Sequence, residues 1–200
     1  MLTSGIPGEI DAVITWVDGD DAAHRAKLDH HLKQVGHAPA AAAATRFRSV
    51  GEIDYCVASL LRFAPFLRRI FIVTDAQVPP VVARSTGWPE ALRGKLAVVD
   101  HREVFAGFED SLPTFNSLSI ESVLHRVPGL AEHYIYLNDD FLLLRPVAPE
   151  DWFSGGEPVL RGHWRPQPQH GLGRRARRWL SLLTGQDPTP NRAGYRDVQA

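Results

Sequence analysis

The chain has 200 residues, of which 44% are hydrophobic, and a formal net charge of -1. This length suits one domain with its own core, and the balanced charge argues against a nucleic-acid partner. The single cysteine, Cys56, excludes an internal disulfide framework. No apolar run is long enough to span a bilayer, and no basic segment followed by an apolar stretch begins the chain. We therefore expect a cytoplasmic protein.

The first half of the sequence predicts a strand and two helices. Residues 10–17 form an apolar run typical of a strand, and residues 22–35 carry apolar side chains at helical spacing. Ser49 and Glu52 have the spacing of a capping box, which predicts a helix that begins with Ser49 as its cap and ends at Pro65. Its expected apolar face consists of Ile53, Val57, Leu60 and Leu61.

The second half continues the alternation of strands and helices. Residues 69–74 and 96–99 predict strands, residues 116–127 predict a helix, and a further strand begins at Tyr134. Strands that alternate with helices indicate βαβ units. We therefore predict an α/β fold with a mostly parallel, Rossmann-like (GT-A-like) sheet flanked by helices.

The composition changes near residue 155, where glycine and proline become frequent. We predict a core over residues 1–155 and a tail over 156–200, with a short helix at 174–183 in the tail and a loop at 38–44 in the core. The basic cluster Arg174 to Arg178 either forms a solvated helix face or contacts an anionic polymer or phospholipid surface.

The run from Tyr134 to Leu144 contains Asn138, Asp139 and Asp140 inside an otherwise apolar stretch. An unpaired carboxylate in a buried strand is costly or becomes protonated, so a divalent cation is expected there. One aspartate would bind the metal directly and the other would act through water or orient a neighbour. The alternative is an Asn-Asp turn that caps the following segment.

Three other predicted strands end in acids, at Asp18, Asp75 and Asp100. Ligands of open α/β sheets bind outside the carboxyl ends of the strands. We therefore expect these acids to lie on one edge of the sheet together with Asp139 and Asp140. Such a carboxylate cluster suits a hard cation, Mg²⁺ or Mn²⁺. The sequence has no zinc-ligand pattern, no phosphate-binding P-loop, no dinucleotide-binding glycine motif and no hydrolase nucleophile elbow.

Four other side chains have both a functional and a structural interpretation. Arg46 and Arg48, which precede a predicted helix, are either bidentate phosphate ligands or solvated side chains. Trp16 is either a core aromatic or stacks near a base or sugar. Asn116 caps the helix that follows, points that helix terminus at an anion, or does both.

Taken together, these motifs resemble the Stealth family of sugar-1-phosphate transferases, which includes bacterial capsule-polymer phosphotransferases and the animal enzyme that starts the mannose-6-phosphate tag. The first similar block covers residues 10–21. The second consists of short matches in fixed order, at 46–48, 51–52, 64–66, 70–79, 99–101, 112–117, 121, 124–125, 128–130 and 136–140. Together the blocks span roughly residues 9–153.

The resemblance implies a metal-dependent transfer of hexose- or N-acetylhexosamine-1-phosphate from a UDP-sugar to a hydroxyl of a saccharide or polysaccharide acceptor. The product is a phosphodiester, UMP is released, and the process is capsule or exopolysaccharide synthesis in the bacterial cytoplasm, with peripheral inner-membrane contact through Arg174 to Arg178. The resemblance implies that Asp139 and Asp140 bind Mg²⁺ or Mn²⁺ and that Asp18 and Arg48 take part in the reaction. The implied donor-pocket residues are Trp16, Arg46, Asp75, Asn116, Glu121 and Asn138.

The chain departs from the family pattern in two respects. Ser49 stands where the family commonly has an aspartate. The family also has shorter downstream blocks with a histidine and basic residues, for which His163 and His170 are poor candidates, so we expect the chain to be part of a longer protein. Two other functions stay open: a glycosyltransferase that releases UDP, and a donor-binding fragment without activity.

Overall fold

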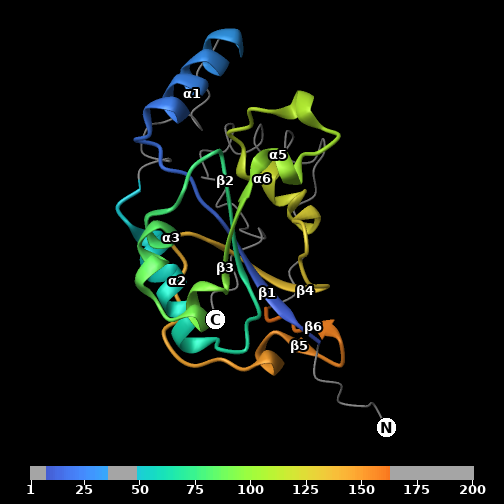
Figure 1. Cartoon of the computed structure of the whole chain (residues 1–200). Coiled ribbons are helices and arrows are strands. Elements are labelled where there is room, and N and C mark those ends of the chain that lie inside the picture. Colours follow the sequence, from blue (N-terminus) through green and yellow to red (C-terminus); the bar gives the residue numbers. More distant parts are fainter. Residues whose placement is uncertain (1–7, 36–48, 163–200) are drawn as a thin grey trace, which may run out of the picture. The chain divides into compact units, whose positions relative to one another are not determined.

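A computed structural model describes residues 8–35 and 49–162 of the chain. Its centre is a four-stranded sheet in the order β3-β2-β1-β4, in which every neighbouring pair is parallel (Figure 1). The strands are β1 (Ile10–Thr15), β2 (Ile70–Thr74), β3 (Leu96–Asp100) and β4 (His133–Asn138). The predicted α/β fold with a parallel, Rossmann-like sheet is therefore confirmed.

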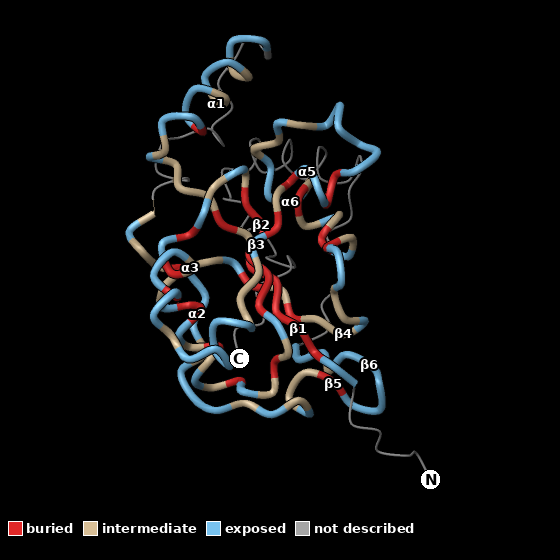
Figure 2. Tube along the Cα trace, in the orientation of Figure 1, coloured by how far each residue is buried: buried red, intermediate tan, exposed pale blue. Residues whose placement is uncertain are grey.

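The two central strands are buried along almost their whole length, as Figure 2 shows. Strands that are covered on both faces are near-continuously apolar rather than alternating, which explains the apolar runs in the sequence. Successive side chains point to opposite faces of the sheet. Ala12 and Ile14 therefore join one apolar cluster, and Val13 joins the other.

Helices cover both faces of this sheet. On one face, α2 (Glu52–Phe63) packs four buried side chains, and α3 (Pro80–Arg84) adds Val81. On the other, α5 (His101–Val104) and α6 (Ser117–Glu121) contribute Val104 and Ile120. The remaining elements are α1 (Ala22–Val35), α4 (Glu90–Arg93), the 3-10 helices Ser85–Gly87, Glu109–Ser111, Leu124–Arg126 and Pro149–Asp151, and the antiparallel pair β5 (Phe153–Ser154) and β6 (Glu157–Pro158).

These elements belong to a compact unit that runs to Pro158, and a second unit over Val159–Ala200 lies almost wholly outside the described residues. The predicted core and tail, divided at residues 155 and 156, stay a prediction. The predicted loop at 38–44 and helix at 174–183 lie outside the described residues. No helix in the described ranges combines the length and apolar character that a membrane crossing requires.

The predicted capping box of α2 is wrong. The residue that caps the helix is Gly51, which has φ of 94° and provides no side-chain hydrogen bond. Glu52 begins the helix instead of occupying its third position, and its Oε2 accepts a hydrogen bond from the backbone N–H of Val50 at 2.7 Å. Glycine adopts this left-handed conformation without steric cost, so the chain turns into the helix two residues later than predicted. The apolar face is nevertheless as expected, with Ile53, Val57 and Leu60 buried.

The predicted helix over residues 116–127 is broken in the middle. It consists of α6, which ends at Glu121, and the 3-10 turn Leu124–Arg126. At the break, the hydroxyl of Ser122 donates to the backbone carbonyl of Ser119 at 2.8 Å. Serine side chains that bond to nearby backbone compete with regular helix. Ile120, Leu124 and Val127 are still buried, so the helical spacing correctly identified the face that packs on the sheet.

The predicted strand from Tyr134 is shorter than the apolar run. β4 ends at Asn138, and the backbone N–H of Phe141 bonds to the carbonyl of Asn138 at 3.2 Å, which closes a turn. Beyond the turn, the apolar side chains of Phe141 and Leu144 are 54% and 85% exposed. The expectation that Asp139 and Asp140 lie inside a buried strand is therefore wrong, because both follow the strand end. The first strand likewise ends at Thr15 rather than at residue 17.

Asp11, on β1, holds the opposite end of the sheet together. Its carboxylate is fully buried and accepts hydrogen bonds from Arg68 Nε at 2.9 Å and Nη2 at 2.5 Å. The backbone N–H groups of Arg69 and Ala131 donate to the same carboxylate at 3.1 and 2.7 Å. One side chain thus ties β1 to the segments that lead into β2 and β4. The charge is fully paired, which is the condition for a buried carboxylate to be tolerated.

Replacing Asp11 should destabilise the protein strongly. Asp11→Ala leaves the Arg68 guanidinium and two backbone N–H groups without their acceptor, and we expect a loss of about 3–5 kcal/mol in the free energy of unfolding. Urea denaturation followed by circular dichroism measures it. Glu9→Gln is the matched control, since Glu9 pairs with the same arginine at 2.9 Å but is 68% exposed, and its effect should stay below about 1 kcal/mol. Equal effects of the two variants would contradict a structural role for the buried pair.

Candidate functional site

A pocket of about 530 Å³ opens at the carboxyl ends of β1 and β4. In this sheet β1 is followed along the chain by β2 on one side, whereas β4 joins it on the other side. This is the switch point at which open α/β sheets bind ligands. The pocket is lined by Thr15, Trp16, Val17, His24, Glu52, His101, Thr114, Phe115, Ser117, Ile120, Asn138, Asp139 and Asp140. Four predicted site residues, Trp16, Asn138, Asp139 and Asp140, therefore line one pocket.

The turn after β4 carries the negative charge of this pocket. Burial, together with the neighbouring charges of Asp140 and Glu52, raises the pKa of the Asp139 carboxyl to about 6. Glu52 was not among the site residues predicted from the sequence. It begins α2, and only the fold brings it to the pocket. Negative charges near a carboxylate disfavour its ionised form, and at Asp139 this repulsion adds to the effect of burial. A cation in the pocket would relieve that repulsion.

The residues of the pocket fit a cation such as Mg²⁺ or Mn²⁺ that takes part of its ligands from water and substrate. They do not fit a metal that needs all of its ligands from the protein. Within the described ranges, no three His, Cys, Asp or Glu side chains are close enough to form a complete protein site. Mg²⁺ usually takes only one or two carboxylates and completes its shell with water and substrate phosphates. Asp139 and Asp140 supply that number, so the arrangement suits a cation that arrives with a phosphorylated ligand.

Cys56 lies directly beneath the turn as a core thiol. It is fully buried, and its Sγ is 3.9 Å from the backbone carbonyl of Asn138. Burial raises the pKa of the thiol to about 12, and the charges of Asp139 and Asp140 act in the same direction. A thiol that stays protonated is a poor nucleophile. Cys56 is therefore a core thiol and not a nucleophile.

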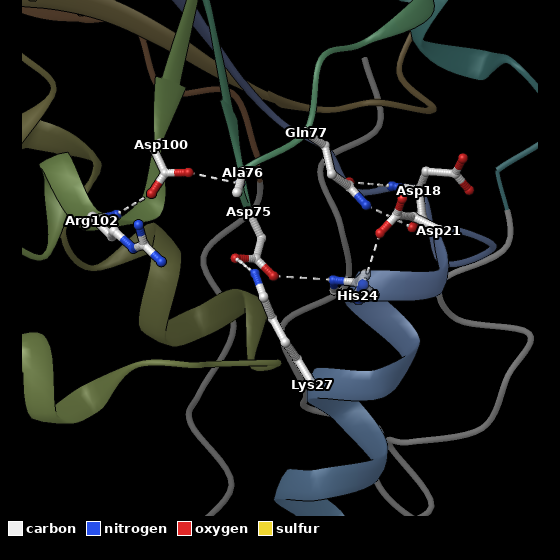
Figure 3. A network of polar contacts seen from close by, with 9 residues as sticks. All are labelled: Asp18, Asp21, His24, Lys27, Asp75, Ala76, Gln77, Asp100 and Arg102. Atoms are coloured by element: carbon white, nitrogen blue, oxygen red, sulfur yellow. Dashed lines mark hydrogen bonds and ion pairs between the residues drawn. The ribbon is translucent and has the colours of Figure 1, made fainter.

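Asp75 holds helix α1 at the end of β2, as Figure 3 shows. Its Oδ1 accepts from Lys27 Nζ at 2.7 Å, and its Oδ2 is 3.3 Å from His24 Nδ1. These contacts hold the pKa of Asp75 well below its usual range despite the partial burial of the carboxyl. Asp75 does not line the pocket, whereas the buried His24 does. Asp75 therefore contacts the pocket only indirectly, by holding the ring of His24.

Asp18 and Asp100 also organise loops at this edge (Figure 3). The backbone N–H of Asp18 donates to Gln77 Oε1 at 2.8 Å, and Gln77 Nε2 donates back to the carbonyl of Asp18 at 3.0 Å. Asp100 caps α5 and accepts from the backbone N–H of Ala76 at 2.7 Å. The expected grouping of acids at strand ends exists in the fold. However, neither Asp18 nor Asp100 lines the pocket.

The other predicted residues occupy different positions. Trp16 is only 5% exposed and belongs to the core beneath the pocket, as in its structural interpretation. Asn116 caps α6 by accepting from the backbone N–H of Leu118 at 3.1 Å. Glu121 approaches the site through the hydroxyl of Tyr136, at 3.3 Å. Arg46 and Arg48 lie outside the described residues, and so does the cluster at 174–178. Contacts of these side chains with a ligand stay predictions.

Two buried histidines of the pocket were missed. His24 packs edge-on against Phe115 with ring centroids 5.4 Å apart, and burial lowers the pKa of His101. His24 lay in a helix predicted only from its apolar spacing, and no sequence signal separated it from solvated histidines. His101 directly follows a strand-end acid. That position could have identified it, because strand ends in such sheets line the ligand crevice.

Comparison with known families now adds to this geometry. Residues 8–30 match conserved region 1 of Stealth proteins, and residues 46–159 match conserved region 2. The chain belongs to the Stealth family. The resemblance inferred from residues 9–153 is thereby confirmed, and the matched regions contain every predicted site residue.

Several curated relatives of this Stealth chain have names that state an activity. It is 46% identical to the exopolysaccharide phosphotransferase SCO6021 of Streptomyces coelicolor over 72% of the chain, and 38% identical to the exopolysaccharide phosphotransferase cps2G of Lactiplantibacillus plantarum over 77%. It is 37% identical to the capsular polysaccharide phosphotransferase WcwK of Streptococcus pneumoniae over 73%. The matched segments cover 25%, 42% and 42% of those relatives, respectively.

Removing the charge of Asp139 should stabilise the Stealth chain in the absence of divalent cations. Because the pKa of Asp139 is about 6 in the folded protein and lower when unfolded, the folded state binds more protons between these values and loses stability as the pH rises. Asp139→Asn removes this cost, so we expect a gain of about 1–2 kcal/mol at pH 7 that disappears below about pH 4. Thermal unfolding in EDTA from pH 4 to 8 measures this gain in stability.

The control is Asp110→Asn, at an exposed site away from the pocket, which should change the stability little. A destabilised Asp139→Asn variant at pH 7 would contradict the assignment.

Proposed function

We propose that this chain forms the donor site of a metal-dependent transferase that moves a sugar-1-phosphate from a UDP-sugar to an acceptor hydroxyl during capsule or exopolysaccharide synthesis. The transferred group would be a hexose- or N-acetylhexosamine-1-phosphate, and the acceptor a saccharide or polysaccharide. One observation carries the proposal: the adjacent aspartates Asp139 and Asp140 line a pocket at the switch point of the sheet, and the pKa of Asp139 is raised. Family membership and the names of the relatives support the reaction class.

The proposed reaction suits a site of this composition. The acceptor oxygen forms a bond to the phosphorus that carries the sugar, the phosphoanhydride bond breaks, UMP leaves, and the acceptor proton is released. Phosphoryl transfer depends mainly on positioning and on neutralising charge. The bound Mg²⁺ or Mn²⁺ would neutralise the diphosphate. Asp139 and Asp140 would hold that cation, and the 530 Å³ pocket would exclude part of the surrounding water.

The proposal assigns a donor site to this chain and the complete activity to a longer protein. The matched segments cover no more than 42% of the relatives named above. Acceptor recognition and further catalytic groups therefore belong to the proposal for the whole protein. The bacterial cytoplasmic location and the membrane contact of Arg174 to Arg178 stay predictions.

The metal site can be tested by binding alone. Titration calorimetry with UDP-N-acetylglucosamine and UDP-glucose should show binding that requires Mn²⁺ or Mg²⁺ and disappears in EDTA. Asp139→Asn combined with Asp140→Asn should weaken binding at least 100-fold, because the cation loses both carboxylates. The control combines Glu132→Gln with Glu157→Gln, which removes the same charge from two exposed positions outside the pocket. Metal-dependent binding that survives loss of both aspartates would refute the metal assignment.

The leaving nucleotide decides between two transfer reactions that such a pocket could support. A sugar-1-phosphate transferase breaks the bond between the bridging oxygen of the diphosphate and the phosphorus that carries the sugar, and it releases UMP. A glycosyltransferase instead breaks the bond between the sugar carbon and the diphosphate oxygen, and it releases UDP. We expect UMP, detected by anion-exchange chromatography, when the whole protein is incubated with a UDP-sugar, Mn²⁺ and a saccharide acceptor, and the same assay on this chain alone tests whether it is active by itself. UDP as the product would refute the proposed reaction. Binding without either product would identify the chain as a donor-binding fragment.

A further inference from the structure

The hydroxyl of Tyr136 lies at the centre of a polar cluster beside the pocket. It is 3.1 Å from Thr15 Oγ1, and it donates to Asn138 Oδ1 at 2.8 Å and to Glu121 Oε1 at 3.3 Å. Thr15 and Asn138 line the pocket, whereas Tyr136 and Glu121 do not. The cluster therefore connects β1, β4 and α6 immediately before the acidic turn.

The tyrosine acts as a hydrogen-bond donor over the whole physiological pH range. Burial raises its pKa to about 12, so the hydroxyl keeps its proton. That single proton lies between two acceptors, and the shorter distance is to Asn138. The Thr15 hydroxyl can donate to the phenol oxygen in turn, so that this oxygen both donates and accepts a hydrogen bond.

This contact determines what Asn138 offers to a ligand. An asparagine side chain has one oxygen acceptor and one nitrogen with two N–H donors. The oxygen of Asn138 is occupied by Tyr136, and nothing in the described ranges accepts a hydrogen bond from its amide nitrogen. Amide N–H groups donate to anionic oxygens and cannot bind a cation. Asn138 is thereby distinguished from Asp139, which directly follows it in the turn.

We propose that Tyr136 is a positioning residue that orients Asn138, so that the asparagine amide donates to a diphosphate oxygen of the nucleotide-sugar. Asp139 and Asp140 hold the cation, and Asn138 binds the anion that accompanies it. Glu121 contributes through Tyr136, which accounts for a donor-site role of a residue that does not line the pocket. This inference rests on the proposed function, because it requires a diphosphate in the pocket.

Two separate titrations test the inference. Tyr136→Phe keeps the ring and removes only the hydroxyl. We expect its affinity for UDP-N-acetylglucosamine at saturating Mn²⁺ to fall about ten-fold, because the misoriented amide loses one hydrogen bond to the charged diphosphate. Its affinity for Mn²⁺ alone, measured by electron paramagnetic resonance, should not change.

Tyr134→Phe is the matched control, because Tyr134 lies two residues away on the same face of β4 and packs in the same cluster. Its hydroxyl makes no hydrogen bond within the described ranges, so both affinities should match those of the unmodified chain.

A double-mutant cycle with Asn138 separates orientation of the amide from a general structural effect. Asn138→Ala, at an exposed position, should itself weaken donor binding about ten-fold with unchanged Mn²⁺ affinity. Adding Tyr136→Phe should then have no further effect. Asn138→Ala also tests the role of the amide if Tyr136→Phe fails to fold.

Three results would overturn the inference. These are unchanged donor affinity in Asn138→Ala, additive losses in the double variant, and reduced Mn²⁺ affinity in Tyr136→Phe, which would show that the amide oxygen serves the cation. Failure of the unmodified chain to bind Mn²⁺ and the UDP-sugar would instead refute the proposed function. The two failures are therefore distinguishable.

Discussion

The parallel pairing of β1 with both β2 and β4 is the constraint on which the rest of the structure depends. β1 is buried on both faces, and its register with β4 places Thr15 opposite Asn138. Asp11 fixes the other end of the same strand through Arg68 and two backbone N–H groups. Because both neighbours of β1 are held in register, the polar ends of β1 and β4 meet at one point. The pocket and the acidic turn occupy that point.

The acidic turn places carboxylates where burial works against their charge. The pKa of Asp139 is raised mainly because the carboxyl is partly buried, and the charges of Asp140 and Glu52 add to this effect. The Cys56 thiol beneath the turn stays protonated and neutral, so it supplies no positive charge that could pair with these carboxylates. A cation with its diphosphate would compensate the turn from the pocket side. In the proposed arrangement, the Asn138 amide that Tyr136 orients would bind the diphosphate, while the two carboxylates bind the cation.

The remaining strand-end acids contribute in a different way. Asp75 joins α1 to β2, Asp100 caps α5, and the backbone of Asp18 pairs with the side chain of Gln77. Each interaction positions a loop or helix next to the pocket, and Asp75 contacts a histidine that lines it. An edge rich in acids thus serves both as architecture and as a potential cation site. The sequence pattern alone does not distinguish the two roles.

The sequence by itself determined the fold class, the family, and the residues that make up the acidic turn. Apolar runs that alternate with helical spacing specify a parallel α/β sheet, since each element must bury an apolar face. Local detail depended on competing interactions that periodicity does not capture. Gly51 displaced the start of α2, Ser122 interrupted the helix at 116–127, and the apolar run after Asn138 turned out to be exposed.

Only the tertiary structure decided which acids face the pocket. Asp139 and Asp75 are both strand-end aspartates in the sequence, yet one has a raised pKa and the other a lowered pKa. The difference arises because Asp139 is buried without a cationic partner among the described residues and lies near other carboxylates, whereas Asp75 contacts His24 and Lys27. These partners come from distant parts of the chain, so their effect on each aspartate follows from the fold and not from its local sequence.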